Sequence, residues 1–181
     1  KLVADALLAR GTVANLSGSG SVVSELETAR SHAEASGARI TSLQVSCELG
    51  RALRRDGRID DALTLLGGVS EEAGRLGLKS VGAVADFYRA EAMLERGDRE
   101  GAADVAAASL KEGESMGDRE LVVGCRCLLA RVASDAGESA DHAACCLREA
   151  TSLARELGPM AASFLSRADI SRDISTAAEI L

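Results

Sequence analysis

The stretch RALRRDGRIDDALTLLGGVSEEAGRLG, residues 51–77, contains the pattern that decides the fold. Its apolar residues recur at every third or fourth position, which places them on one face of each of two helices. Gly57 lies between the two helices and Gly77 follows the second, where the left-handed conformation of glycine ends a helix. The stretches 90–117 (AEAMLERGDREGAADVAAASLKEGESMG) and 128–158 (LLARVASDAGESADHAACCLREATSLARELG) repeat this arrangement. The sequence therefore predicts a series of helix hairpins.

The spacing of the glycines predicts the length of the repeat. Two interleaved sets recur every 40 residues to within one residue, namely Gly57, Gly97 and Gly137, and Gly37, Gly77, Gly117 and Gly158. Helices are expected near residues 2–16, 20–36, 41–56, 59–76, 80–96, 98–116, 118–136, 139–157 and 160–177. Their N-caps are expected at Thr41, Ser80, Asp98, Asp118 and Ser139, and Pro159 fits a first helical turn.

These helices predict an all-α fold, a right-handed superhelical stack of antiparallel hairpins with about 40 residues per repeat. One hairpin cannot bury both of its faces, so neighbouring hairpins are expected to share a continuous core. The hairpins fall at about 1–38, 39–78, 79–118 and 119–158, with a partial repeat at 159–181. The chain begins at Lys1 and stops inside an amphipathic pattern, so we expect it to be a fragment of a larger protein.

Composition narrows the classes of partner. The net charge of −7 argues against a nucleic-acid surface, which would carry clustered Lys and Arg, and against an anionic membrane. The sequence has no apolar run of about 18 residues that would span a bilayer. The five cysteines, an odd number without framework spacing, indicate a reducing, cytoplasmic setting.

The order of residues within a hairpin is specific. The second hairpin contains, in order, Leu49-Gly50, Leu53, Gly57, Ala62 and Leu66. This order resembles the tetratricopeptide (TPR) repeat, in which small residues on the two helices face each other. Gly50 and Ala62 would then leave room for a close approach of the two backbones. In the fourth hairpin, His142 stands where the small residue is expected.

The wording RxxGRxDxALxLL at residues 54–66 is similar to long repeats in bacterial MalT-like and LuxR-type ATP-binding transcription regulators. That resemblance implies a region that senses an effector or a partner, between a nucleotide-binding domain and a DNA-binding domain. The chain itself has neither a P-loop (GxxxxGK(S/T)) nor a recognisable helix-turn-helix. We therefore expect no cofactor and no direct contact with nucleic acid.

The TPR resemblance also implies a concave groove lined by the first helix of each hairpin. The residues of this groove that we expect to bind a partner are Gln44, Arg51, Arg54, Arg55, Phe87, Glu91, Glu95, Arg131 and Asp135. Further groove positions are Asp5, Leu8, Asn15, Cys47, Val84, Leu94, Cys127 and Ser134.

Two interpretations of these groove residues stay open. The arginines at 51, 54 and 55 offer forked donors that could clamp a carboxylate or phosphate. Alternatively, they pair with Glu91 and Glu95 across the groove. Phe87 is either an anchor for a ligand or a core residue.

Other motifs favour packing over chemistry. The sequence GESMG at 113–117 matches the GxSxG of a nucleophile elbow, but it ends a predicted helix instead of joining a strand to a helix. Cys127 and Cys146 are expected to approach each other across the fourth hairpin, as small buried hydrophobes or as a redox pair. His32 and His142 have no evident nucleophile beside them.

The sequence therefore predicts a module that binds a protein or peptide, or a small effector, without catalysis. An alternative is a scaffold that self-associates through its end helices.

Overall fold

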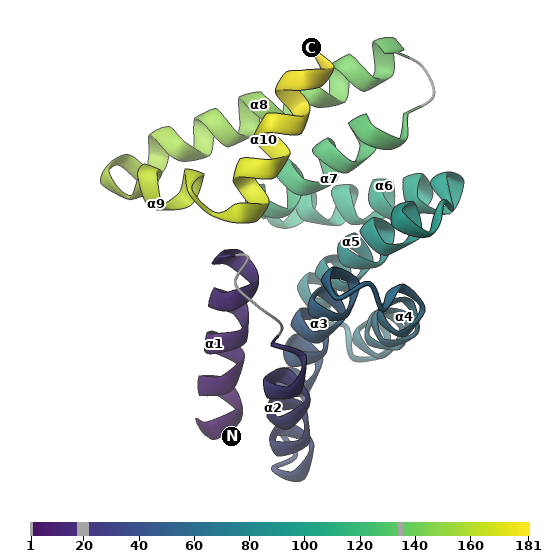
Figure 1. Ribbon diagram of the computed structural model, residues 1–181, viewed down its shortest axis with the longest axis vertical. Coiled ribbons are helices and arrows are strands. Elements are labelled where there is room, and N and C mark those ends of the chain that lie inside the picture. The colour runs from purple at the N-terminus through teal and green to yellow at the C-terminus, as the bar shows by residue number, and fades with distance from the viewer. Residues whose placement is uncertain (1, 18–21, 134–135) are drawn as a thin grey trace.

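In the computed structural model, which describes residues 2–17, 22–133 and 136–181, the secondary structure is helical throughout (Figure 1). The expected all-α class is confirmed. The elements are α1 (Leu2–Ser17), α2 (Val23–Ala35), α3 (Arg39–Arg55), α4 (Ile59–Leu76), α5 (Lys79–Arg96), α6 (Arg99–Met116), α7 (Arg119–Val132), α8 (Ala136–Leu157), a 3₁₀ turn η1 (Gly158–Met160), α9 (Ala161–Leu165) and α10 (Ala168–Ile180).

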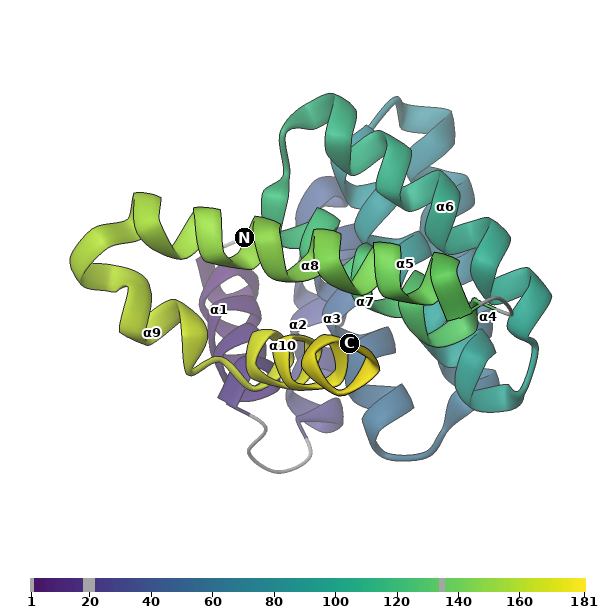
Figure 2. The ribbon, with the colours of Figure 1, turned by 90° about the horizontal axis from the view of Figure 1, so that it is seen from above.

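The helices form two layers. Each helix from α1 to α8 packs against the next in the chain, and α1, α3, α5 and α7 also pack one on another. In contrast, α2, α4, α6 and α8 make no contact with one another in the part of the chain that the structure describes. Only the layer of α1, α3, α5 and α7 is therefore continuous, and it is called the inner layer below. Helix α10 packs on α7 and α8 and also touches α1 (Figure 2).

Glycines end the helices where the sequence predicts. The backbone φ is positive at Gly37, Gly57, Gly77, Gly97, Gly117 and Gly158. Asp98 and Asp118 cap the next helices, accepting hydrogen bonds from the amides of Gly101 at 3.0 Å and Leu121 at 3.1 Å. These helix ends follow from local chemistry.

Three expected N-caps are wrong, because their helices begin earlier. Thr41 and Ser80 lie inside α3 and α5, and Ser139 lies inside α8. Their hydroxyls are therefore available elsewhere: Thr41 donates to Asp5 at 3.1 Å and Ser139 donates to the carbonyl of Ala130 at 2.7 Å.

Two expected helices differ in length. The helix predicted at 118–136 ends at Val132, and Gly137 lies in the first turn of α8 rather than between helices. The helix predicted at 160–177 is divided into η1, α9 and α10. The chain becomes extended at Arg167, and this bend lets Phe164 and Ile170 enter the same core beside α7 and α8.

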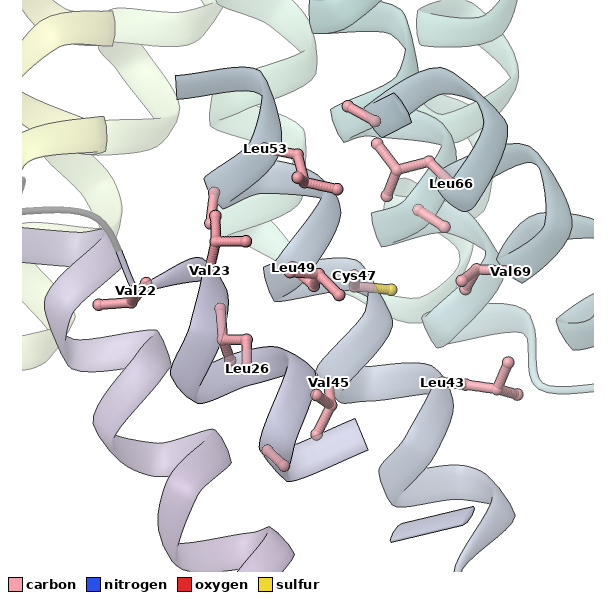
Figure 3. Close-up of a cluster of buried hydrophobic side chains, with 14 residues drawn as sticks. Val22, Val23, Leu26, Leu43, Val45, Cys47, Leu49, Leu53, Leu66 and Val69 are labelled. Carbon is pink, nitrogen blue, oxygen red and sulfur yellow. The ribbon is translucent and has the colours of Figure 1, made fainter. Parts of the chain in front are cut away.

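Gly50 gives α3 and α4 their close contact. A Cβ built on Gly50 would lie 2.5 Å from Cγ of Leu66, which is fully buried in the core of this hairpin (Figure 3). Gly11 on α1 faces Leu26 on α2 in the same manner. The group for which Gly50 makes room is thus the Leu66 side chain rather than the backbone at Ala62.

Gly50→Ala is expected to lower the free energy of unfolding by about 1–2 kcal/mol, since overpacking outweighs the higher helix propensity of alanine. Gly68, inside α4, has no atom within 4 Å of a built Cβ. Gly68→Ala should therefore raise the free energy of unfolding by about 0.5–1 kcal/mol. Urea unfolding of both variants checks the contact, and a gain in both would show that Leu66 does not fill the space above Gly50.

Candidate binding groove

The inner layer of helices carries two adjoining hollows. The N-terminal hollow, of about 240 Å³, lies between α1, α3 and α5 and is lined by Leu8, Thr12, Gln44, Cys47, Glu48, Ser80, Val81 and Val84. The C-terminal hollow, of about 140 Å³, lies between α3, α5, α7 and α10. Val84 lines both hollows, so they form one groove along the inner face.

The floor of the N-terminal hollow is apolar and uncharged. Leu8, Val81 and Val84 supply its aliphatic surface. The Cys47 thiol lies 3.9 Å from the carbonyl oxygen of Val81, to which it donates. Burial raises the pKa of Cys47 to about 12, with a further contribution from the charge of Glu48. The thiol is thus protonated at neutral pH and acts as part of an apolar surface.

Three neutral polar side chains stand around this floor: Thr12, Gln44 and Ser80. In the described part of the chain, none of the three takes part in a side-chain hydrogen bond. Gln44 and Ser80 are exposed to solvent and Thr12 is half-buried. Their donors and acceptors are therefore available to a ligand that lies on the floor.

The carboxylate at this hollow, Glu48, is already neutralised. Asn15, which is buried, donates through Nδ2 to Glu48 Oε2 at 2.7 Å. Arg51 lies 3.8 Å from the same oxygen. The charge of Glu48 is thus balanced within the protein, and the N-terminal hollow favours an uncharged ligand.

The C-terminal hollow is built around a buried ion network. The Glu91 carboxylate, 3% exposed, forms an ion pair with Arg54 Nη2 at 3.0 Å and accepts a hydrogen bond from Arg172 Nη2 at 3.0 Å. Arg54 also pairs with Glu95, and Arg172 pairs with Asp173 at 3.0 Å. The network joins α3, α5 and α10, whose residues lie far apart in the sequence.

These contacts decide between the two interpretations of the groove arginines. Arg54 pairs with Glu91 and Glu95, as in the second interpretation. Arg51 is also buried; its guanidinium lies 5.3 Å from the centre of the Tyr88 ring and donates to the Tyr88 hydroxyl at 3.4 Å. Both arginines therefore have partners within the protein, and Arg51 also lines the C-terminal hollow.

The remaining expected groove residues are dispersed. Phe87 has features of both a ligand anchor and a core residue. It lines the C-terminal hollow, but it also packs closely on α7, where a Cβ on Gly124 would lie 2.7 Å from its ring. Arg55 is exposed and donates to the carbonyl oxygen of Asn15 at 3.2 Å. The half-buried Arg131 does not line either hollow, and Asp135 lies outside the described residues.

Sequence reasoning missed several residues of the groove. Thr12, Ser80 and Val81 line the N-terminal hollow, and Ser80 was expected to be a helix cap. Arg172 and Asp173 reach the C-terminal hollow from α10. The recurrence of groove positions from hairpin to hairpin could have indicated Ser80 and Val81, but no local pattern predicts the contact between Arg172 and Glu91.

Four of the five cysteines are buried, His142 is half-buried and His32 is exposed. Cys127 and Cys146 are fully buried in the same core cluster, and the Cys127 thiol donates to the carbonyl oxygen of Asp173 at 3.5 Å. The neighbouring Cys146 thiol, followed by burial, raises the pKa of Cys127. His142 lies 3.3 Å from Arg126, and burial followed by the charge of Arg126 lowers its pKa. The described residues contain no cluster of His, Cys, Asp and Glu that would hold a metal ion. Ser115, in the GESMG sequence, donates to the carbonyl of Glu112 within α6.

Comparison with known proteins gives no match to a family model and no match to a curated protein. Among the described residues, no helix combines the length and apolar character that crossing a membrane requires.

Proposed function

We propose that this protein is a non-catalytic interaction module that binds an uncharged, extended peptide segment in the N-terminal hollow. The observation that supports this most is the set of unpaired polar groups on Thr12, Gln44 and Ser80 around an aliphatic floor. The Gln44 amide offers a donor and an acceptor together, which matches the N–H and C=O of a peptide backbone. The floor of Leu8 and Val84 would take one aliphatic side chain of the peptide.

We further infer a TPR-like, right-handed array with a repeat of about 40 residues. Two kinds of recurrence support it. The positive-φ glycines Gly37, Gly77 and Gly117 keep this step. An ion pair keeps the same step. It joins the first turn of one helix to the C-terminal part of the next, from Arg39 to Glu72 and from Lys79 to Glu112. The wording of residues 54–66 supports a place in a MalT-like or LuxR-type regulator, where such a module would sense a partner or effector in a bacterial cytoplasm.

Selection from a display library of random short peptides tests the groove. We expect the selected peptides to carry aliphatic residues and few charges. Ser80→Lys introduces a charge at the hollow and should weaken binding at least about tenfold. Gln44→Ala removes the amide and should weaken binding about fivefold, the effect of one lost hydrogen bond.

Both residues are exposed, so neither change should alter the urea midpoint. Ala107→Lys, on the exposed outer face of α6, is the matched control and should leave affinity unchanged. Peptides that bind Ser80→Lys as tightly as the native protein would contradict the proposed site.

A further inference from the structure

Helix α1 presents an apolar face to solvent. Leu2 is 85% exposed, Val3 55% and Val13 65%, and Ala6 between them is also exposed. The helix is apolar on nearly all sides, a composition typical of a helix that is covered all round. This outward face of α1 is distinct from the groove, which α1 lines through Leu8 and Thr12 on another side.

The corresponding face of α3 is buried. Gly11 and Gly50 each make room for a leucine of the following helix, and this shared contact aligns α1 with α3. In that alignment Ala6, Arg10 and Val13 of α1 correspond to the residues of α3 that are no more than 3% exposed, Val45, Leu49 and Ala52. The corresponding positions in α5, 40 residues further on, are Ala85, Arg89 and Ala92. Those in α7, another 40 residues on, are Cys125, Leu129 and Val132. All of these except the half-buried Arg89 are buried.

The preceding hairpin covers this face in each case. Val45 and Leu49 of α3 lie beside Val23 and Leu26 of α2 in one core (Figure 3). Cys125 of α7 donates to the Ser109 hydroxyl of α6 at 3.4 Å. The face that α1 exposes is thus the face that α3, α5 and α7 use to bind the second helix of a preceding hairpin.

We propose that the outward face of α1 is an interface for a helical hairpin whose second helix packs on Ala6 and Val13 as α2 packs on α3. The hairpin would present small and aliphatic side chains at helical spacing, as α2 does with Leu26 and Ala29. This interface is separate from the peptide site, and its occupation leaves the groove open.

A second copy of the chain is the less suitable occupant. For a head-to-tail contact α10 would have to offer an apolar outer face, but its apolar residues Ile170 and Ile174 pack inward on the core beside α7 and α8. Its exposed residues outside the groove include Ser171, Ser175, Ala178 and Glu179. In a two-fold contact, the exposed Arg10 side chains of both copies would lie in one small interface, where their like charges would repel each other.

An extended chain tests the interface. In this chain, a copy of residues 39–79 is joined directly ahead of Lys1. The copied α4 then precedes α1 in the same way that α4 precedes α5 in the native chain, with Lys1 in the place of Ser80. We expect one urea transition with a higher midpoint and a steeper dependence on urea, because the added hairpin docks and unfolds with the rest.

The substitution Val13→Asp distinguishes docking of the added hairpin on α1 from an effect on the stability of the native fold itself. In the native chain Val13 is exposed, and the substitution should change the unfolding equilibrium constant less than about twofold. In the extended chain it should raise that constant at least about tenfold, because the carboxylate would be buried. Ala107→Asp, on the outer face of α6, should have the same small effect in both chains.

Two results would overturn the proposal. The first is an extended chain with two transitions in which Val13→Asp has the same small effect as in the native chain. The second is a native chain whose mass in light scattering rises to a dimer and is returned to a monomer by Val13→Asp, since the occupant would then be a second copy. Peptide binding in the groove is unaffected by either result, so the two proposals fail independently.

Discussion

Replacing Glu91 with alanine is expected to lower the free energy of unfolding by about 3–5 kcal/mol, the largest effect of any single substitution proposed for this chain. The Glu91 carboxylate lies between the guanidinium groups of Arg54 and Arg172 at 3.0 Å from each. Arg54 is 7% exposed, so without Glu91 its charge would stay buried with only the exposed Glu95 as its partner. Urea unfolding followed by circular dichroism measures the loss.

Matched variants distinguish the loss of the Glu91 ion pairs from the loss of the volume that its side chain fills. Glu95→Ala removes the exposed carboxylate of the same network and should cost less than about 1 kcal/mol. Glu91→Ala combined with Arg54→Met and Arg172→Met should recover much of the stability, because no buried charge is left unpaired. Equal losses in Glu91→Ala and Glu95→Ala would show that Glu91 does not hold α10 to α5.

Stability is expected to fall steeply as the pH rises above 9. Burial raises the pKa of Cys47 and of Cys125 to about 12 from the ordinary value of 9.0, so the folded state holds both protons after the unfolded state has released them. Their contribution is fully present below pH 9 and is lost as the pH rises toward 12. Each thiol should lower the free energy of unfolding by about 1.4 kcal/mol per pH unit in that window.

The double variant Cys47→Ala and Cys125→Ala checks this assignment. It should reduce the slope of stability against pH between 9 and 11 by about 2.8 kcal/mol per pH unit. Cys145→Ala is the control, because Cys145 is the one half-exposed cysteine of the five. A slope in the double variant equal to that of the native chain would place the alkaline transition elsewhere, for example at Tyr88, whose pKa is also raised by burial.

The sequence predicts those parts of the fold that depend on local chemistry. The predicted helix 59–76 coincides with α4, and Gly57 and Gly77 lie at its two ends, because periodicity and glycine both act over a few residues. The bend at Arg167 was not predicted, since it depends on the docking of Phe164 and Ile170 into a core formed by other helices.

The sequence predicts where the groove lies, but it does not predict which of its side chains are available to a ligand. Gln44 and Val84 were expected on the inner face, and both line a hollow there. The role of Arg54 was undecided from the sequence, because its partners Glu91 and Glu95 lie 37 and 41 residues away. No local pattern could show that these charges neutralise one another and leave the uncharged hollow beside α1 as the better ligand site.

The most direct test of the proposed peptide site is photo-crosslinking of a selected peptide. A photoreactive amino acid replaces Gln44 on the rim of the N-terminal hollow, or Ala107 on the outer face of α6 as the control. We predict that the peptide crosslinks to position 44, that excess unlabelled peptide suppresses the product, and that position 107 gives none. Equal crosslinking at the two positions, or crosslinking at position 107 alone, would contradict binding in the groove.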